Sequence, residues 1–275
     1  MTADRRRFLA LGAGLAVLAI LPRPAGAAPS SRLIDARWTR FGSGGDPDHA
    51  AWARFLAKHL RTGTASGVNL LDYGAAKADR AALRGYLDAM QAVRPTRLSR
   101  DAAMAYWVNL YNAVTIDVVL EAYPVDSIKK VRGGLFNTGP WGDELVRVEG
   151  ADLSLDDIEH GILRPVWRDP RIHYAVNCAS IGCPNLAAAP YTAGALEPML
   201  DAGARAYVAH PRGARLDEDG LTVSSIYDWF QEDFGGTETG VIRHLAGFAD
   251  PAKAERLRSV ERIADYAYDW SLNAT

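Results

Sequence analysis

The 275-residue chain contains only two cysteines, and its 31 basic side chains nearly balance its 33 acidic ones. Two cysteines are too few for a disulfide-rich small protein, and without a second cysteine pair they do not form a closed structural zinc site. The near-neutral charge gives no basic surface of the kind that binds nucleic acid, so we expect no nucleic-acid partner. Instead, 48% hydrophobic and 23% charged residues are typical of a globular protein with a substantial core.

The sequence also lacks phosphate-binding motifs, internal repeats and low-complexity linkers. The glycine-rich stretch Gly133–Gly142 has neither GxGxxG spacing nor a Walker lysine, so we expect an ordered loop that leads into a hairpin. No feature calls for a cofactor or a metal ion, and we expect neither. The sequence therefore predicts one α+β domain over residues 28–275, mainly helical with a small central β-sheet.

The first 27 residues are typical of an export signal. They contain Arg5-Arg6-Arg7, an apolar run from Leu9 to Leu21, and small residues at Ala25–Ala27. The apolar run is shorter than the roughly 20 residues that span a bilayer, so we expect a cleaved signal and no membrane span after its removal. The arginines followed by Phe8-Leu9 fit the twin-arginine pattern. These features predict a periplasmic or secreted protein.

Apolar residues recur three and four positions apart through much of the chain, which predicts helices. The strongest prediction is a central buried helix over Arg100–Ala122, with Ser99 as its N-cap and Pro124 beyond its end. Another helix is expected to carry Ile158–Leu163 and to end at Pro165, and Ile226–Phe234 is expected to form a helical turn or a helix. Further helices are expected at Ala50–Leu60, Asp79–Val93, Ala193–His210 and Thr239–Phe248. Strands are expected at Glu144–Val148, Ile172–Asn177 and Leu221–Val223, and the aromatic tail Arg262–Asn273 is expected to dock on the core.

The segment Arg171–Pro184 holds both cysteines, and three interpretations of them remain open. A structural disulfide between Cys178 and Cys183 suits a loop in an oxidising compartment. A thiolate nucleophile at Cys178 needs a nearby base or cation to lower its pKa. A metal site that adds His160 or His173 is the least expected, because the spacing of the cysteines is looser than CxxC.

His160 is the candidate base. On a helix Asp156 and Arg164 are its i−4 and i+4 neighbours, so we expect Asp156 to orient the ring and Arg164 to hold an anion, while Glu159 faces elsewhere. A charged, capped surface helix is the alternative. His173 is expected to be a hydrogen-bonded core histidine. The remaining histidines that we assign, all expected at the surface or at helix ends, are His49, His59, His210 and His244.

Three ordered motifs resemble the DUF547 family, whose function is unknown. They are Trp107–Thr115, Ser154–Arg164, and Asp169–Cys178 followed by Cys183-Pro184, and the resemblance covers about residues 98–234. The glycine that often follows the family's first cysteine is Ala179 here. The family brings no established reaction, but the resemblance implies where the site lies. The matching positions are Asn109, Tyr111, Asn112, Glu159, His160, Arg164, Arg171, His173, Asn177, Cys178, Cys183 and Pro184.

Two classes of function remain open. In the enzymatic one, Cys178 is a nucleophile activated by His160, and Asn177 or Asn109 assists, in a thiol-dependent hydrolysis or acyl transfer. In the other, a domain with a structural Cys178–Cys183 disulfide binds a small molecule, a peptide or a cell-envelope ligand without catalysis. The expected binding residues are Asn109, Tyr111, Asn112, Glu159, Arg164, Arg171 and His173.

Overall fold

The computed structural model describes residues 30–132 and 139–275. The predicted export signal and the first part of the predicted glycine-rich loop, residues 133–138, lie outside the described residues. In chain order the elements are η1 (Ala36–Thr39), α1 (Ala50–His59), β1 (Leu60–Arg61), β2 (Leu70–Leu71), α2 (Tyr73–Ala78), α3 (Arg80–Ala92), η2 (Pro95–Arg97), α4 (Arg100–Ala122), η3 (Ile128–Lys130), β3 (Val146–Val148), β4 (Ala151–Leu153), η4 (Asp157–Leu163), α5 (Arg164–Trp167), α6 (Ile172–Ala175), η5 (Ala193–Ala195), α7 (Leu196–Ala209), β5 (Ala214–Asp217), β6 (Gly220–Ser224), α8 (Ile226–Trp229), η6 (Gln231–Phe234), α9 (Glu238–Phe248), α10 (Pro251–Arg258) and β7 (Asp265–Ala267).

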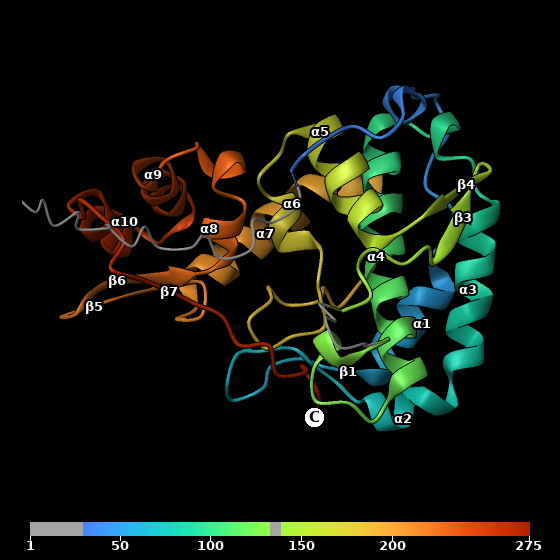
Figure 1. The fold of residues 1–275 in the computed structure, drawn as a ribbon, viewed down its shortest axis with the longest axis horizontal. Coiled ribbons are helices and arrows are strands. Elements are labelled where there is room, and N and C mark those ends of the chain that lie inside the picture. The colour runs from blue at the N-terminus through green and yellow to red at the C-terminus, as the bar shows by residue number, and fades with distance from the viewer. Residues whose placement is uncertain (1–29, 133–138) are drawn as a thin grey trace, which may run out of the picture.

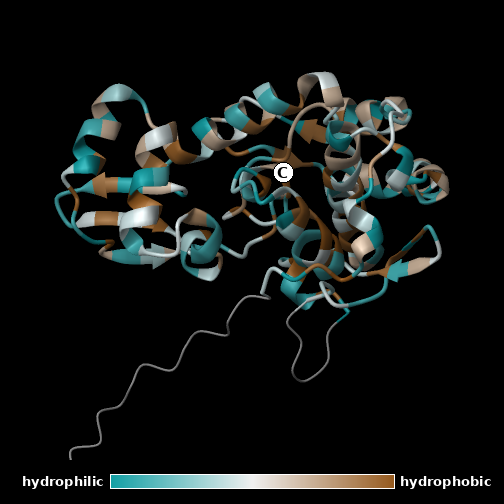
Figure 2. Ribbon diagram, turned by 90° about the horizontal axis from the view of Figure 1, so that it is seen from above, coloured by the Kyte–Doolittle hydropathy of each residue, from teal (hydrophilic) through white to brown (hydrophobic). Residues whose placement is uncertain are grey.

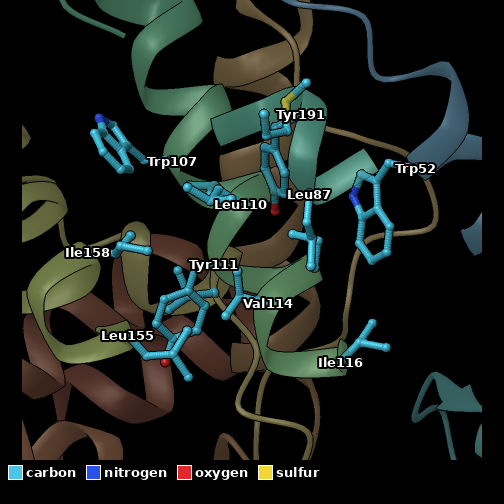
Figure 3. Packing of buried hydrophobic residues seen from close by; sticks show 14 of the residues in the cluster. Trp52, Leu87, Trp107, Leu110, Tyr111, Val114, Ile116, Leu155, Ile158 and Tyr191 are labelled. Atoms are coloured by element: carbon cyan, nitrogen blue, oxygen red, sulfur yellow. The ribbon is translucent and has the colours of Figure 1, made fainter. Parts of the chain in front are cut away.

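Helix α4 is the central element, as predicted, and its bounds agree with the predicted ones. The Ser99 hydroxyl caps it by accepting from the backbone N–H of Ala102. Its residues are buried from Ala102 to Leu120, so the helix is enclosed on all sides. Figure 1 shows α1 and α3 beside it, and Figure 3 shows the packing of its side chains, including Trp107 and Leu110.

The strands form three small sheets. β1 pairs with β2 and β3 with β4, both antiparallel, while β6 lies between antiparallel β5 and parallel β7. The β3–β4 hairpin turns through Glu149 and Gly150, both at positive φ. The mainly helical α+β class is therefore confirmed, with its strands divided among three sheets rather than gathered in one central sheet.

The core has two hydrophobic clusters, one around α4 and one around α7, α9 and β6. Helix α6 joins them, because Ile172 belongs to the first cluster and Tyr174 to the second. Figure 2 shows the two parts of the molecule side by side. Within residues 30–132 and 139–275, no helix combines the length and the apolar character that crossing a membrane requires.

The aromatic tail docks on the core, as predicted. β7 extends the third sheet, and the chain then runs along the loop that follows Cys178. The backbone N–H groups of Ile181 and Gly182 donate to Ser271 and Asp269, and Asn273 donates back to Ala179. The loop between the cysteines is therefore held by the C-terminal part of the chain.

The predicted strand Ile172–Asn177 is wrong, because residues Ile172–Ala175 form helix α6. A short apolar run fits a buried helix as well as a buried strand. The preceding Asp169-Pro170-Arg171 decides in favour of the helix: the Asp169 carboxylate accepts from the N–H of Arg171, and its carbonyl accepts from Ile172. This side-chain turn starts the helix locally.

Pro165 does not end its helix, contrary to the prediction. The π-helical turn η4 runs directly into α5, whose first turn includes Pro165, and proline is tolerated at such a position. The helix ends instead at Arg168, which adopts a left-handed conformation. His49 and His59 lie at the two ends of α1, one of the positions predicted for them, but neither lies at the surface: both are buried, bonded to Tyr86 and to Asp79 respectively.

Candidate functional site

Both cysteines are in a disulfide, Cys178–Cys183. The Tyr268 hydroxyl lies 3.0 Å from the Cys178 sulfur and 3.1 Å from that of Cys183, and it donates because disulfide sulfurs carry no proton. Cys183 is buried, whereas Cys178 is partly exposed. Of the three interpretations that the sequence left open, the structure contains the disulfide.

Asn177 organises the loop between the cysteines. Its amide nitrogen donates to the carbonyl of Pro184 over 2.7 Å, and its amide oxygen accepts from the N–H of Ala179 over 2.8 Å. Ala179 has a φ of 60°, in the left-handed region that favours glycine. The glycine that often stands here in the DUF547 pattern therefore has a conformational reason.

Two asparagines of α4 bind segments of backbone. Asn112 donates to the carbonyl of Ala175 and accepts from the N–H of Asn177. Asn109 makes the same two-way contact with the backbone of Tyr191. Each amide forms hydrogen bonds with backbone N–H and C=O groups of a buried segment. This explains why a helix that is buried among apolar groups carries these polar side chains.

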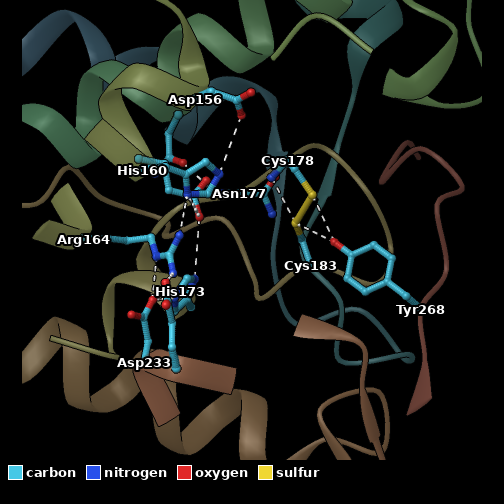
Figure 4. Close-up of polar contacts among 12 residues, drawn as sticks. Asp156, His160, Arg164, His173, Asn177, Cys178, Cys183, Asp233 and Tyr268 are labelled. Atoms are coloured by element: carbon cyan, nitrogen blue, oxygen red, sulfur yellow. Dashed lines mark hydrogen bonds and ion pairs between the residues drawn. A yellow bond between two sulfur atoms is a disulfide. The ribbon is translucent and has the colours of Figure 1, made fainter. Parts of the chain in front are cut away.

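Beside the disulfide lies what we call the histidine–carboxylate cluster: Asp156, Glu159, His160, Arg164, His173, Glu232 and Asp233. Asp156 directly precedes the π-helical turn η4, which supplies Glu159 and His160. Arg164 begins α5, His173 lies in α6, and Glu232 and Asp233 lie in η6. Figure 4 shows Asn177 between the His160–Arg164 side of the cluster and the disulfide with Tyr268. π-helical turns occur often at functional sites, and η4 brings neighbouring side chains to one centre here.

Arg164 determines the protonation of His160. Its Nη1 lies 3.1 Å from His160 Nδ1, and since a guanidinium only donates, Nδ1 is the acceptor and the ring proton sits on Nε2. Nε2 lies 3.6 Å from an Asp156 oxygen, as the i−4 spacing predicted. Burial lowers the pKa of His160, and Arg164 lowers it further against the opposing pull of Glu159.

His173 is a hydrogen-bonded core histidine, as predicted. Its Nε2 lies 2.7 Å from Asp233 and its Nδ1 lies 3.6 Å from Glu159. Burial alone would lower its pKa, but these two carboxylates, one facing each ring nitrogen, outweigh burial and raise it, which favours the imidazolium form. The Phe230 ring stacks on it with 4.5 Å between centroids, and the Arg164 guanidinium also lies over Phe230.

Glu159 does not face away from His160, contrary to the prediction, because one carboxylate oxygen lies 4.0 Å from His160 Nδ1. It also accepts from the buried Tyr111 hydroxyl. Burial would raise its pKa, but the surrounding charges and hydrogen bonds, including those of His173 and the Tyr111 hydroxyl, lower it to about 2. Glu159 is therefore a permanent anion inside the cluster.

Asp156 is the cluster's accessible titrating group. Its side chain is 36% exposed. Burial, with repulsion from Glu159 and Asp157, raises its pKa to about 6. The pKa values of Asp156 and Glu159 thus differ widely: Asp156 ionises near neutral pH, and Glu159 is protonated only in strong acid. Such a difference within one cluster is associated with binding and acid–base sites.

A family model described as "Protein of unknown function, DUF547" matches residues 95–208. Residues 95–208 of the chain are therefore similar to DUF547, and this match covers less than half of the chain. Comparison with curated proteins and with solved structures finds no match. The resemblance predicted from the three motifs is confirmed, although the matched range ends before α8 and η6, which the predicted range included.

One predicted site residue of the DUF547-like region lies in a different network. Arg171 binds Asp169 within its own turn, and its Nη1 reaches Asp201 and Glu197 on α7. It joins α6 to α7 rather than contributing to the histidine–carboxylate cluster. Outside residues 1–29 and 133–138, no group of three or more histidine, cysteine, aspartate or glutamate side chains has the arrangement of a metal site.

Four further residues of this site were not predicted from the sequence, and no local pattern points to them. Glu232 and Asp233 bond to Arg164 across 68 and 69 positions, and Phe230 stacks on His173. Tyr268 reaches the disulfide from the tail. All four lie beyond residue 208, where the DUF547 match ends, so the matched domain is completed by the chain that follows it.

Proposed function

We propose that this protein is an exported, disulfide-containing ligand-binding domain, and that the histidine–carboxylate cluster binds a cationic group such as the amine of an envelope peptide. One observation carries the proposal: the accessible members of the cluster are acids and its cations are buried. The side chains of Asp156 and Glu232 are 36% and 58% exposed, whereas those of Arg164 and His173 are each 2% exposed.

The cluster's charge supports a cationic ligand. Four carboxylates face two cations, Arg164 and the His173 imidazolium, and His160 is neutral. At neutral pH this leaves an excess of negative charge, and that excess lies on the solvent side. Such a surface attracts cations and disfavours anions.

The experiment compares a short peptide containing one lysine with the same peptide acetylated at that lysine, by isothermal titration calorimetry. We expect the free amine to bind more tightly than the acetylated form, and more tightly as pH rises through about 6, because Asp156 then ionises. Asp156→Asn should remove both the preference and its pH dependence. Asp88→Asn, at an exposed aspartate of α3, is the matched control and should change neither. Equal affinity for the two peptides, or no binding of either, contradicts the proposal.

A thiol-dependent hydrolase or transferase is the second candidate function. Cys178 is its candidate nucleophile, because Cys178 is partly exposed and Cys183 is buried. This function requires that the disulfide is reduced. It also requires that the hydrogen bond from Arg164 to His160 Nδ1 is broken, because Nδ1 is the basic nitrogen of the neutral ring. Within the described residues no hydrogen bond joins His160 to Cys178. If reduced protein labels with iodoacetamide at Cys178 faster than a free thiol, and His160→Ala slows this labelling, the enzymatic candidate gains; equal, slow labelling of both cysteines removes it.

Export is the remaining part of the proposal, and the sequence of residues 1–27 supports it. Replacement of Arg5 and Arg6 by lysine should block export if the twin-arginine route is used. Undiminished export of that variant would assign the signal to the general secretory route instead. Retention of the unaltered protein in the cytoplasm would contradict export by either route.

A further inference from the structure

A cleft of about 910 Å³ lies away from the histidine–carboxylate cluster, and its lining is rich in arginine. The arginines that line it are Arg37, Arg40, Arg94, Arg97 and Arg147. Arg37 lies in η1 and Arg40 directly follows it. Arg97 lies in η2 and Arg94 directly precedes it, while Arg147 lies in β3. Among the described residues that line the cleft, Glu149 is the one acid, and its side chain is 11% exposed. The described lining therefore has five arginines and one carboxylate, a positive local charge, whereas the whole chain has a formal net charge of −2.

Glu149 fixes the walls of the cleft to one another. Its carboxylate accepts from Arg94 and Thr96 of one wall, and its carbonyl accepts from Arg37 of another. It does so from the left-handed turn of the β3–β4 hairpin, at a φ of 46°. Its negative charge is thus used to hold the site's own arginines, and it is largely shielded from solvent.

A second contact fixes the positions of Arg40 and Arg97. The N–H of Gly42 donates to Leu98 over 2.7 Å, and that of Gly44 donates to Arg97 over 3.0 Å. A Cβ at Gly42 would lie 2.2 Å from the Arg97 carbonyl oxygen, so only glycine allows this approach. The segments that carry Arg40 and Arg97 are therefore clamped side by side before any ligand arrives.

The guanidinium groups of Arg40 and Arg97 are exposed, and within the described residues neither forms a hydrogen bond or an ion pair. Arg37 and Arg147, in contrast, are paired with Asp35 and Asp152, neither of which lines the cleft. Guanidinium groups match phosphate oxygens through paired N–H donors. The cleft also falls in the size range of small-molecule sites.

We propose that this cleft binds a ligand with two or more linked phosphate groups, with Arg40 and Arg97 as the principal contacts. The ligand's source, a free phosphate chain or the diphosphate of a nucleotide, is separated by the test below. Phe41, also in the lining, offers a ring on which a base could stack.

The experiment titrates the full chain with pyrophosphate and, separately, with ADP, by isothermal titration calorimetry. Pyrophosphate should bind, and its affinity should fall as salt rises because the contacts are ionic. Arg97→Ala and Arg40→Ala should each weaken binding by about tenfold, while Arg97→Lys, which keeps the charge and loses the paired donors, should fall between wild type and Arg97→Ala. If ADP binds more tightly than pyrophosphate and Phe41→Ala removes that difference, the nucleotide is the source; equal affinities assign the binding to the phosphates.

Arg243→Ala, at an exposed arginine of α9, is the matched control and should leave the affinity unchanged. Circular dichroism and melting temperature check that each variant is folded. No binding of pyrophosphate at millimolar concentration overturns the proposal. So does equal weakening by Arg243→Ala and Arg97→Ala, because the attraction would then belong to the protein's overall charge and not to this cleft.

Discussion

Arg164 donates a hydrogen bond from Nη1 to Nδ1 of His160 over 3.1 Å, and this one contact determines the chemistry available to the histidine. The ring is neutral, its proton is on Nε2, and its lone pair is in use. A histidine that is named as a base because of its position in a motif is, in this fold, an acceptor for a buried arginine.

Loss of Arg164 should strongly destabilise the protein. The Arg164→Met variant retains the aliphatic volume but leaves Asp233 without its guanidinium partner and His160 Nδ1 without its donor. We expect a loss of about 3 kcal/mol in the free energy of unfolding, measured by urea denaturation, because removing one member of a buried ionic network leaves the rest uncompensated. Arg243→Met at the exposed face of α9 is the control and should stay within about 0.5 kcal/mol of wild type.

Stability should depend on pH on both sides of a maximum. His173 and Arg164 lower the pKa of Asp233 against the effect of burial, so its contribution is present above the unfolded value of 3.8 and is lost as pH falls through the lowered folded pKa. The pKa of His173 is raised, so its contribution is complete below 6.5 and is lost as pH rises through the folded pKa. The contribution of the His173–Asp233 pair to the free energy of unfolding should therefore be greatest between those two values.

The control for this pH dependence is Asp233→Asn, which removes the charge that both effects share. In urea denaturation across a pH series, this variant should be less stable at the maximum and show a shallower decline on both sides. An unchanged profile would mean that the His173–Asp233 contact does not govern acid or alkaline stability.

The disulfide should stabilise the native protein moderately. Its loop is short, with a sequence separation of 5, so restricting the unfolded chain contributes about 2 kcal/mol. We expect Cys183→Ser to lose about that amount of the free energy of unfolding. Thiol titration of the untreated protein should detect no free thiol even in denaturant. Two reactive thiols before reduction would contradict the disulfide.

Ala179→Gly should stabilise the loop between the cysteines. Alanine at a φ of 60° carries a steric cost that glycine avoids, and this cost exceeds the entropic cost of the extra flexibility of glycine in the unfolded chain. The expected gain is up to about 1 kcal/mol in the free energy of unfolding. Ala187→Gly, at a residue without positive φ, is the comparison and should not stabilise. A loss at position 179 equal to that at 187 would contradict the strain.

Trp107→Ala should test the core around α4. The ring is 1% exposed and contacts Trp38 edge to face, with 5.2 Å between centroids. Its removal should cost about 3–5 kcal/mol in thermal or denaturant unfolding. Trp229→Ala, at a partly exposed ring, should cost less. A loss below about 1 kcal/mol at Trp107 would contradict full burial of this face.

The sequence predicted α4 well because its evidence is local: an N-cap at Ser99, a long apolar pattern and Pro124 beyond the end. It failed at Ile172–Asn177, where an apolar run fits either a strand or a buried helix and the Asp169 turn decides. It placed His49 and His59 at helix ends, where they lie, but it did not predict their burial, because a polar neighbourhood in sequence says nothing about contacts with Tyr86 or Asp79.

The candidate site was only half predictable for the same reason. Asp156, His160 and Arg164 lie one turn apart, so helical spacing places them together. Asp233 approaches His173 across 60 positions, and only the tertiary fold makes that contact. The spacing of the cysteines permitted a bond without requiring one, so the choice among disulfide, nucleophile and metal ligand depended on where the sulfurs lie.

The contact between the disulfide loop and the tail has a consequence for the timing of folding during synthesis. Ser180 meets Tyr268 across 88 positions, and the backbone of Ala179 pairs with Asn273. At ribosomal rates of about 5–20 residues per second, several seconds separate the emergence of the two cysteines from that of the residues that cover them. During that interval the cysteine loop is without its tail partners and open to oxidants and chaperones, so its final environment is set late, by the last part of this sequence to be made.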